Sequence, residues 1–429
     1  MANIGFISLG CAKNQVDCER MMYRVQEAGH TVKSDVVGSD VVVINTCGFI
    51  DSAKSEAIDY ILQTAALKAE GLVGKILVTG CLSQRYQGDI LKEMPEVDGI
   101  LGTGSYTEIV PAIEKLLNGE QVVDFGSIDA PEVETGRIMT TAGHYAFIKI
   151  AEGCDNHCSY CVIPYARGRV RSKPLEDIRE EVASLEKKGF SEIVLVGINL
   201  SAYGTDCGAS ICDAVELAAS FDGIKRVRLG SLEPDHMTPD VTKRLAECKK
   251  LCPQFHISLQ SGCDKTLKRM NRHYTAAEYE ELCTRLRSEF EDATLTTDVM
   301  VGFSGETKED FEISRDFVKK IGFEKVHVFP YSRRAGTRAA EFPDVVENAE
   351  KERRSREMIA AAGEVRHEFL ERQIGRTVEV LFEEKLRDGS IQGYTANYTP
   401  VRIKSGCTHG LRKVKITACG DDWCEGELI

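Results

Sequence analysis

Alternating apolar and polar segments divide the chain into parts with different periodicity. In the first part, short apolar runs at 3–9, 40–45 and 75–79 alternate with longer segments whose apolar residues recur at helical spacing. This alternation predicts buried parallel strands joined by helices, as in an α/β sheet. The following segment, 126–142, shows no periodicity, and we interpret it as a linker.

The middle of the chain repeats a strand-then-helix unit about six times. Helical patterns at 174–188, 239–250 and 275–290 lie between the predicted strands. Consecutive β/α units favour right-handed crossovers and a parallel sheet. Six units fall short of the closed eight-unit barrel, so we expect an open barrel with a lateral mouth that suits a large substrate. The predicted strands are 146–150, 192–196, 226–230, 255–259, 295–301 and 325–329.

A charged helical segment, 346–371, leads to a tail of short strands that is typical of a small β-barrel. The predicted fold class is therefore α/β, in three domains. These are a Rossmann-like α/β domain at 1–125, a partial (β/α)6 TIM-like barrel at 140–370 and a small β-barrel at 371–429. The tail strands are expected at 376–382, 390–394, 400–404 and 413–417.

Composition and charge narrow the possible functions. No apolar run approaches the ~20 residues that span a bilayer, and the amino terminus lacks the features of a signal peptide. We therefore expect a cytoplasmic protein with no membrane partner. In a reducing compartment the 16 cysteines are better metal ligands, catalytic thiols or buried apolar residues than disulfides. The net charge of −13 disfavours a grip on nucleic acid by the whole surface, so any RNA contact must be local.

Cys154, Cys158 and Cys161 form a C-x3-C-x2-C run directly after a predicted strand. This spacing lets three thiolates of one loop converge on a metal cluster. Three protein ligands on a cubane leave one iron free to bind a small chelating molecule. The alternative is a zinc loop, but structural zinc sites normally have four protein ligands, and His157 has no matching distant pair. We predict an iron–sulfur cluster.

With Tyr160 before the third cysteine, this loop resembles the signature of radical S-adenosylmethionine (SAM) enzymes. The resemblance implies that the free iron binds the amino and carboxylate groups of SAM. An electron passed through the cluster then splits the sulfonium and yields a 5′-deoxyadenosyl radical. In such enzymes the cofactor carries the chemistry, and the protein positions it and excludes water. An open barrel is also the fold that the resemblance implies.

Three further cysteines occupy equivalent places: Cys11 in SLGCAKN, Cys47 in INTCGFI and Cys81 in VTGCLSQ each follow an apolar strand. The carboxyl ends of parallel strands form one edge, where these thiols can meet. Three unrelated buried cysteines are the alternative, which the identical placement disfavours. The pattern resembles the amino-terminal domain of methylthiotransferases, in which such a triplet holds a second [4Fe–4S] cluster. This resemblance covers nearly the whole chain.

The remaining ten cysteines show no such convergence, and we expect core packing or surface thiols. They are Cys18, Cys207, Cys212, Cys248, Cys252, Cys263, Cys283, Cys407, Cys419 and Cys424. Polar residues at barrel strand ends are better candidates for ligand contacts. We expect Tyr160, Glu233 and Gln260 to belong to the cofactor site, with Glu233 and Gln260 on the ribose or methionine part; ordinary hydrogen bonding is the alternative. No catalytic residue is assigned.

Clusters of basic residues suggest where phosphates bind. Two of them flank the predicted mouth, and a solvated charged face is the alternative. Basic strands interleaved with Tyr394 and Tyr398 have the composition of an RNA-binding small barrel. The tail also resembles the TRAM domain that methylthiotransferases use to hold their substrate. The clusters comprise Arg269, Arg272 and His273, then Arg333, Arg334 and Arg338, and in the tail Lys385, Arg387, Arg402, Lys404, Arg412, Lys413 and Lys415.

The resemblance implies a methylthiotransferase that converts C–H to C–S–CH3. One SAM supplies the radical, another the methyl, and sulfur arrives through the second cluster. A flavodoxin- or ferredoxin-like protein is expected to donate electrons. A non-catalytic iron–sulfur or zinc-binding RNA adaptor is the alternative from another class, in which a cofactor-sized barrel would be superfluous.

The substrate depends on which part of the chain is weighted. The first domain, with SLGCAKNQVDCE, looks like RimO-type enzymes, which modify an aspartate of a ribosomal small-subunit protein. The barrel and tail, with HISLQSGCDKTLKRMNRHYT and GYTANYTPVRI, look like the MtaB type, which modify N6-threonylcarbamoyladenosine beside the tRNA anticodon. We put tRNA first, because the barrel and tail face the substrate.

Overall fold

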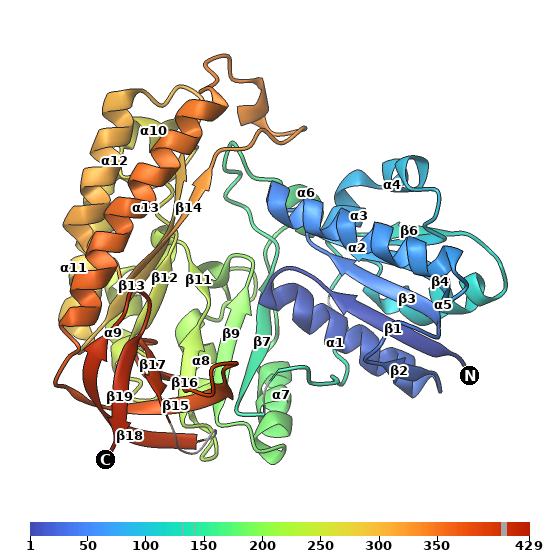
Figure 1. Ribbon diagram of the computed structural model, residues 1–429, viewed down its shortest axis with the longest axis horizontal. Helices are drawn as coiled ribbons and strands as arrows, with labels where there is room; N and C mark the ends of the chain where they lie inside the picture. The colour runs from blue at the N-terminus through green and yellow to red at the C-terminus, as the bar shows by residue number, and fades with distance from the viewer. Residues whose placement is uncertain (132, 142, 405–409) are drawn as a thin grey trace. The chain divides into compact units, whose positions relative to one another are not determined.

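A computed structural model describes residues 1–131, 133–141, 143–404 and 410–429 (Figure 1). The chain forms two compact units. We call residues 1–141, 151–155 and 162–173 the amino-terminal unit, and residues 142–150, 156–161 and 174–429 the barrel unit. Cys407 lies outside the described residues, as do the last residue of the predicted linker and its residue 132. None of the described helices is long and apolar enough to cross a membrane.

The amino-terminal unit is built on a six-stranded parallel sheet in the order β2-β1-β3-β4-β5-β6. The three predicted strands are confirmed as β1, β3 and β4, and three further strands at the sheet's flanks were missed. The strands are β1 (Asn3–Ser8), β2 (Thr31–Lys33), β3 (Ser39–Thr46), β4 (Val73–Gly80), β5 (Gly99–Gly104) and β6 (Val122–Gly126). The helices are α1 (Ala12–Glu27), α2 (Asp51–Ala69), α3 (Cys81–Tyr86), α4 (Gly88–Glu93), α5 (Ile109–Leu117) and α6 (Ile163–Arg167).

Both faces of this sheet are buried, which explains why its strands are apolar throughout rather than alternating. Val41 and Val43 of β3 pack in the core cluster that includes α1 and α5. Val42 and Ile44 point to the other face and pack in the cluster that includes α2. Figure 1 shows α1 and α2 on opposite sides of the sheet.

The barrel unit contains all six predicted barrel strands, with the sheet broken between β10 and β11. Strands β9–β10 and β11-β12-β13-β14 pair in parallel, as expected for an open β/α barrel. Strand β8 pairs antiparallel with the last two residues of β7, in segments of the amino-terminal unit. The strands are β7 (Tyr145–Glu152), β8 (Arg171–Ser172), β9 (Glu192–Gly197), β10 (Arg226–Leu229), β11 (Ser231–Leu232), β12 (Gln254–Ile257), β13 (Thr294–Val301) and β14 (Lys325–Pro330).

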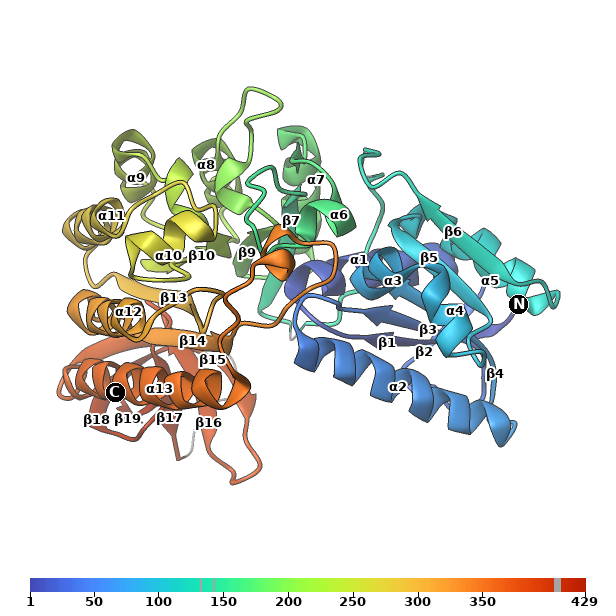
Figure 2. The same cartoon turned by 90° about the horizontal axis from the view of Figure 1, so that it is seen from above.

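Helices follow the barrel strands along the chain (Figure 2), and their buried residues are mostly apolar. Three of them begin with capping boxes, at Ser210, Thr275 and Thr307, which satisfy amide groups of the first turn. The helices are α7 (Leu175–Lys187), α8 (Ile211–Ala219), α9 (Pro239–Ala246), α10 (Asp264–Arg269), α11 (Ala276–Glu289), α12 (Lys308–Ile321) and α13 (Asn348–Glu371). Short 3-10 helices lie at Tyr106–Glu108, Leu200–Ala202, Pro234–His236 and Arg338–Glu341.

The tail closes into a five-stranded barrel in the order β15-β16-β17-β19-β18, which confirms the predicted small β-barrel. Its core is apolar and takes in Leu370 at the end of α13. The four predicted strands are present, and β19, whose sequence CEGEL is mostly polar, was missed. The strands are β15 (Thr377–Lys385), β16 (Ile391–Thr395), β17 (Pro400–Ile403), β18 (Gly410–Cys419) and β19 (Cys424–Leu428).

The aromatic residues of this tail pack inside the barrel unit. The rings of Tyr394 and Tyr398 stack with centroids 4.2 Å apart, and the Arg228 guanidinium from β10 lies 3.9 Å from the Tyr398 centroid. Arg402 lies 3.6 Å over the ring of Trp423. The Arg228 contact joins the small barrel to β10, and the two stacked tyrosines do not form the open base-stacking platform that the composition suggested. Basic side chains on β18 remain exposed.

The carboxyl group of Glu383 on β15 can be used to test how the small barrel packs against the rest of the barrel unit. Burial, with nearby Glu192, raises the pKa of Glu383 to about 7. Between the ordinary pKa of glutamate and about 7, the Glu383 carboxyl is protonated in the folded state and ionised in the unfolded state. The free energy of unfolding therefore falls as the pH rises through this range. We expect Glu383→Gln to stabilise the small barrel by about 1–2 kcal/mol at pH 8 and to change little at pH 4.5. Urea unfolding followed by fluorescence of Trp423, the only tryptophan, measures this.

Glu384→Gln is the matched control, because Glu384 is the exposed neighbour on the same strand. Equal effects of the two substitutions at pH 8, or a gain from Glu383→Gln that is as large at pH 4.5, would contradict the assignment.

Candidate functional site

Cys11, Cys47 and Cys81 lie at one edge of the amino-terminal sheet. Cys11 follows β1 at the start of α1, Cys47 follows β3, and Cys81 follows β4 as the first residue of α3. The three strands are neighbours and run in parallel, so these turns meet at the same level. The predicted convergence of the triplet is therefore present in the fold. Its role as a ligand set stays a prediction.

Glycines allow the three turns to approach closely. Gly10 has φ of +95°, and a Cβ placed on it would lie 2.6 Å from the Cβ of Cys47. Gly80 has φ of +100°, and a Cβ there would lie 2.3 Å from the carbonyl oxygen of Thr46. Both positions combine a left-handed backbone with no room for a side chain. Each glycine directly precedes one cysteine of the triplet.

Asn14 links the three turns by hydrogen bonds. Its Nδ2 donates to the carbonyl oxygens of Leu9 (3.2 Å) and Thr46 (2.9 Å). Its Oδ1 accepts from the Cys81 thiol at 3.7 Å. Asn14 is fully buried, and an amide can satisfy this mixture of acceptors and donors. Asn14 was not predicted as a site residue. Its only mark in the sequence is that a polar residue stands three positions after Cys11, on the face of α1 that packs against the sheet.

The electrostatic surroundings differ among the three thiols. Burial by itself raises the pKa of Cys11. The charge of Lys13, a hydrogen bond from the backbone N–H of Asn14 and the charge of Arg167 outweigh burial, so the pKa of Cys11 is lowered overall. Burial raises the pKa of Cys81 to about 11, against the opposing effect of Arg167. Cys47 also has a raised pKa, from burial and from its neighbour Cys11. The thiolate is the metal-binding form, so an added cation favours all three as ligands.

Arg167, at the end of α6, is the nearest fixed cation. Its Nε donates to the Cys81 Sγ at 3.2 Å, and its Nη1 donates to Asp17 (2.8 Å) and Glu152 (3.0 Å). Its Nη2 donates to Asn14. Burial alone lowers the pKa of Arg167, but these anionic neighbours raise it well above its usual range. Arg167 was not predicted as a site residue, because Asn14, Asp17 and Cys81 are far away from it along the chain.

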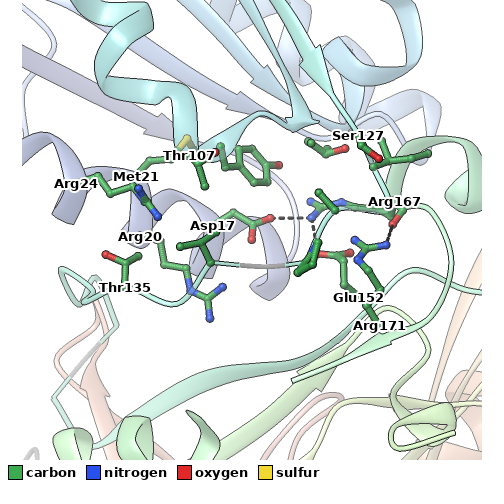
Figure 3. A pocket seen from close by; sticks show the side chains of 17 residues that line it. Asp17, Arg20, Met21, Arg24, Thr107, Ser127, Thr135, Glu152, Arg167 and Arg171 are labelled. Carbon is green, nitrogen blue, oxygen red and sulfur yellow. Dashed lines mark hydrogen bonds and ion pairs between the residues drawn. The ribbon is translucent and has the colours of Figure 1, made fainter. Parts of the chain in front are cut away.

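A small cavity of about 80 Å³ borders this network. Figure 3 shows Asp17 and Glu152 on either side of the Arg167 guanidinium, with Arg20, Arg24 and Arg171 around the same space. All of its lining residues belong to the amino-terminal unit. The cavity is thus flanked by the charged network that holds Cys81.

The second triplet lies in the loop after β7. Cys154 belongs to the amino-terminal unit, where its amide donates to the Gly168 carbonyl at 3.0 Å. Cys158 and Cys161 belong to the barrel unit, where the Cys161 amide donates to the Cys158 carbonyl at 3.0 Å. Ser159 fixes this half of the loop through bonds to the carbonyls of Met270 (2.9 Å) and Arg269 (2.9 Å).

Tyr160 is buried in an apolar cluster beside Cys158 and Cys161. Its ring meets Phe303 edge to face, with centroids 6.2 Å apart, and its carbonyl accepts from Arg334 at 3.2 Å. The cluster shields the loop from water, and the cofactor contact of Tyr160 stays a prediction. Arg334 is buried, so it is not one of the free phosphate-binding cations that the sequence suggested.

Glu233 follows β11 and forms an ion pair with Arg272. The same guanidinium donates from Nη1 to the Cys158 Sγ at 3.3 Å and from Nε to the Tyr274 hydroxyl at 3.0 Å. Burial raises the pKa of Glu233, although Arg272 opposes the rise. Arg272 has only 3% of its side chain exposed, so its interpretation as a phosphate-binding or solvated cation was wrong.

Gln260 lies beyond the carboxyl end of β12, as predicted. Its φ is +64°, which is uncommon for a residue with a side chain. The backbone N–H of Gln260 donates to the Asp298 carbonyl (2.8 Å), and the backbone carbonyl of Gln260 accepts from the Met300 N–H (2.9 Å). These two bonds fix the backbone of Gln260 against β13. Glu233 and Gln260 thus both lie at strand carboxyl ends of the barrel, and their contacts with a cofactor stay predictions.

No three His, Cys, Asp or Glu side chains among the described residues are arranged around a single metal ion. Ligands of a cubane bind different iron atoms and need not meet at one point. For Cys11, Cys47 and Cys81 the gathered thiols, the two clearances that only glycine permits and the cation at Cys81 fit an anionic cluster bound by three thiolates.

An open parallel β/α barrel with a C-x3-C-x2-C loop after its first strand defines the class of radical SAM enzymes. Residues 148–318 match the Radical SAM superfamily, and residues 3–102 match an uncharacterised protein family, UPF0004. The fold is similar to that of the radical S-adenosylmethionine methyltransferase TsrM from Kitasatospora setae. That similarity has a TM-score of 0.56 and 13% identity over 77% of this chain and 73% of that one.

Curated relatives extend the similarity to the full length. The chain is 40% identical, over 418 residues, to the ribosomal protein uS12 methylthiotransferase RimO of Lachnoclostridium phytofermentans, covering 94% of this chain and 95% of the relative. It is 39% identical, over 386 residues, to the protein of the same name from Thermoanaerobacter sp. strain X514, covering 89% and 88%.

The chain therefore belongs to the radical SAM methylthiotransferase family. It is an enzyme that uses S-adenosylmethionine and two [4Fe–4S] clusters, as the resemblance implied. The alternative of a non-catalytic RNA adaptor was wrong.

Asn14→Ala tests how the first triplet is held. The substitution leaves the carbonyls of Leu9 and Thr46 unpaired in a buried site, at about 1–3 kcal/mol each. We expect iron content after anaerobic reconstitution to fall toward half of the parent value, with the second triplet still loaded. Gln15→Ala, at the next and less buried position of α1, is the control. Parental iron content in Asn14→Ala would contradict this role.

Proposed function

We propose that this enzyme methylthiolates an aspartate of the ribosomal small-subunit protein uS12. The observation that carries the proposal is the 40% identity to a uS12 methylthiotransferase over 94% of the chain. This match includes the barrel and the tail, which were the reason for placing tRNA first. These parts therefore no longer favour tRNA over uS12. The substrate that the sequence analysis gave as its alternative therefore replaces tRNA as the first choice.

Two features of the chain support this choice. The net charge of −13 repels a polyanion and favours a basic protein surface. Tyr394 and Tyr398, which suggested an RNA platform, stack on each other, and the Arg228 guanidinium lies over the Tyr398 ring. Exposed basic residues of the tail, among them Lys385, Arg387, Lys404 and those of β18, are the remaining argument for tRNA, and they make tRNA the second candidate.

Cys154, Cys158 and Cys161 are proposed to hold the cluster that binds SAM, and Cys11, Cys47 and Cys81 the second cluster. When bound, the two clusters and SAM supply the radical that removes a hydrogen atom from the substrate. They also supply the sulfur and the methyl group that take its place. The chain's own residues orient the ligands: Asn14 fixes the turns of the first triplet, and Ser159 fixes the second loop. The apolar cluster around Tyr160 excludes water. A flavodoxin- or ferredoxin-like donor is proposed to supply electrons.

A deletion strain tests the substrate. We expect mass spectrometry of its ribosomal proteins to show uS12 without the methylthio group, while the 2-methylthio nucleosides of its tRNA persist. Complementation with the intact gene restores the modification, and complementation with the Cys158→Ala gene does not. Intact uS12 modification together with loss of the tRNA nucleoside would reverse the assignment.

The two triplets are expected to differ in what their loss abolishes. Cys158→Ala should abolish reductive cleavage of SAM, since it removes a ligand of the SAM-binding cluster. Cys47→Ala should retain part of that cleavage and lose methylthiolation. Quantifying 5′-deoxyadenosine and modified uS12 peptide in the same reaction separates the two. Equal loss of cleavage in both variants would argue against separate roles.

A further inference from the structure

Each cysteine triplet has one buried arginine that donates to one of its sulfurs. Arg167 donates to Cys81 (Nε–Sγ 3.2 Å) within the amino-terminal unit. Arg272 donates to Cys158 (Nη1–Sγ 3.3 Å) within the barrel unit. The two side chains are only 2% and 3% exposed. The two arrangements therefore share a buried arginine N–H donated to a cysteine sulfur, from Nε in one and from Nη1 in the other.

Carboxylates fix each guanidinium in the orientation that points one N–H at sulfur. Arg167 is held by Asp17 (2.8 Å) and Glu152 (3.0 Å), which are themselves buried. Arg272 is held by Glu233. A guanidinium keeps its charge at every accessible pH and offers donors in a rigid fork. Its N–H toward sulfur is thus permanent and directed.

Charge compensation alone does not require a contact with sulfur. Arg137 and Glu19 form another buried ion pair of the amino-terminal unit, with 4% and 1% of their side chains exposed. The guanidinium of Arg137 donates to the Glu19 carboxylate. A buried arginine can therefore be accommodated here by a carboxylate. The sulfur contacts of Arg167 and Arg272 are an additional feature.

We propose that Arg167 and Arg272 are positioning residues that each raise the reduction potential of the cluster on their own triplet. The inference rests on the ligand roles given under the proposed function. An N–H donated to a ligand sulfur, from a buried cation, stabilises the added negative charge of the reduced cluster. Arg167 thereby sets the potential of the Cys11–Cys47–Cys81 cluster, and Arg272 that of the Cys154–Cys158–Cys161 cluster.

Two full-length proteins with one cluster each allow the potentials to be read separately. Replacing Cys154, Cys158 and Cys161 by alanine leaves the first triplet, and replacing Cys11, Cys47 and Cys81 leaves the second. Arg167→Lys is introduced into the protein that keeps Cys11, Cys47 and Cys81. Arg272→Lys is introduced into the protein that keeps Cys154, Cys158 and Cys161. Lysine keeps the charge and loses the directed fork. Anaerobic redox titration with paramagnetic resonance detection gives the ratio of reduced to oxidised cluster.

We expect each substitution to lower that ratio about tenfold at a fixed potential, which corresponds to about 59 mV for one electron. Arg137→Lys in the first protein is the matched control and should leave the ratio unchanged. Retention of the cluster with an unchanged potential in both lysine variants would overturn the inference while leaving the proposed function intact. Absence of iron from a single-cluster protein with native arginines would instead refute the ligand assignment, and the inference with it.

A second measurement covers the case in which a lysine variant fails to assemble its cluster. The single-cluster proteins with native arginines are labelled with 15N-arginine and reduced. A hydrogen bond from arginine to a ligand sulfur predicts a weak 15N hyperfine coupling in each of them. Absence of the coupling in both proteins would overturn the inference.

Discussion

Parallel pairing of β1, β3 and β4 is the constraint on which the amino-terminal site depends. Neighbouring parallel strands end at the same edge, so three turns that are distant along the chain come together there. Close approach then requires Gly10 and Gly80, because a side chain at either position would collide with the next turn. Asn14 supplies the hydrogen bonds that the crowded carbonyls need. The placement of the three thiols is thus a consequence of sheet topology.

Buried charge is the second constraint, and it connects folding to chemistry. A buried arginine is tolerated only with anionic partners. In the amino-terminal unit these are Asp17, Glu152 and the sulfur of Cys81. The same ion pairs that make burial of Arg167 possible also fix the direction of its remaining N–H. The Cys81 sulfur therefore accepts a hydrogen bond from a fixed cation that two buried carboxylates hold in place.

Much of the fold and the cysteine framework could be predicted from the sequence. Strands such as β3, whose sequence has a long apolar run, were found, whereas β8, β11 and β19 are too short or too polar to carry a pattern. Local spacing revealed Cys154, Cys158 and Cys161, whereas the shared position after apolar strands revealed Cys11, Cys47 and Cys81. Arg167 and Arg272 were missed or misread, because a count of charges cannot separate a buried ion pair from a solvated cation. Their partners are 150 and 39 positions away, respectively, along the chain.

The segment from Cys154 to Arg167 links the two cysteine triplets along the chain. It carries all three cysteines of one triplet and ends in the arginine that contacts the other. Along it the chain passes from the amino-terminal unit into the barrel unit and back. The cysteines Cys154, Cys158 and Cys161 and the arginine that contacts Cys81 are therefore parts of one continuous segment of the chain.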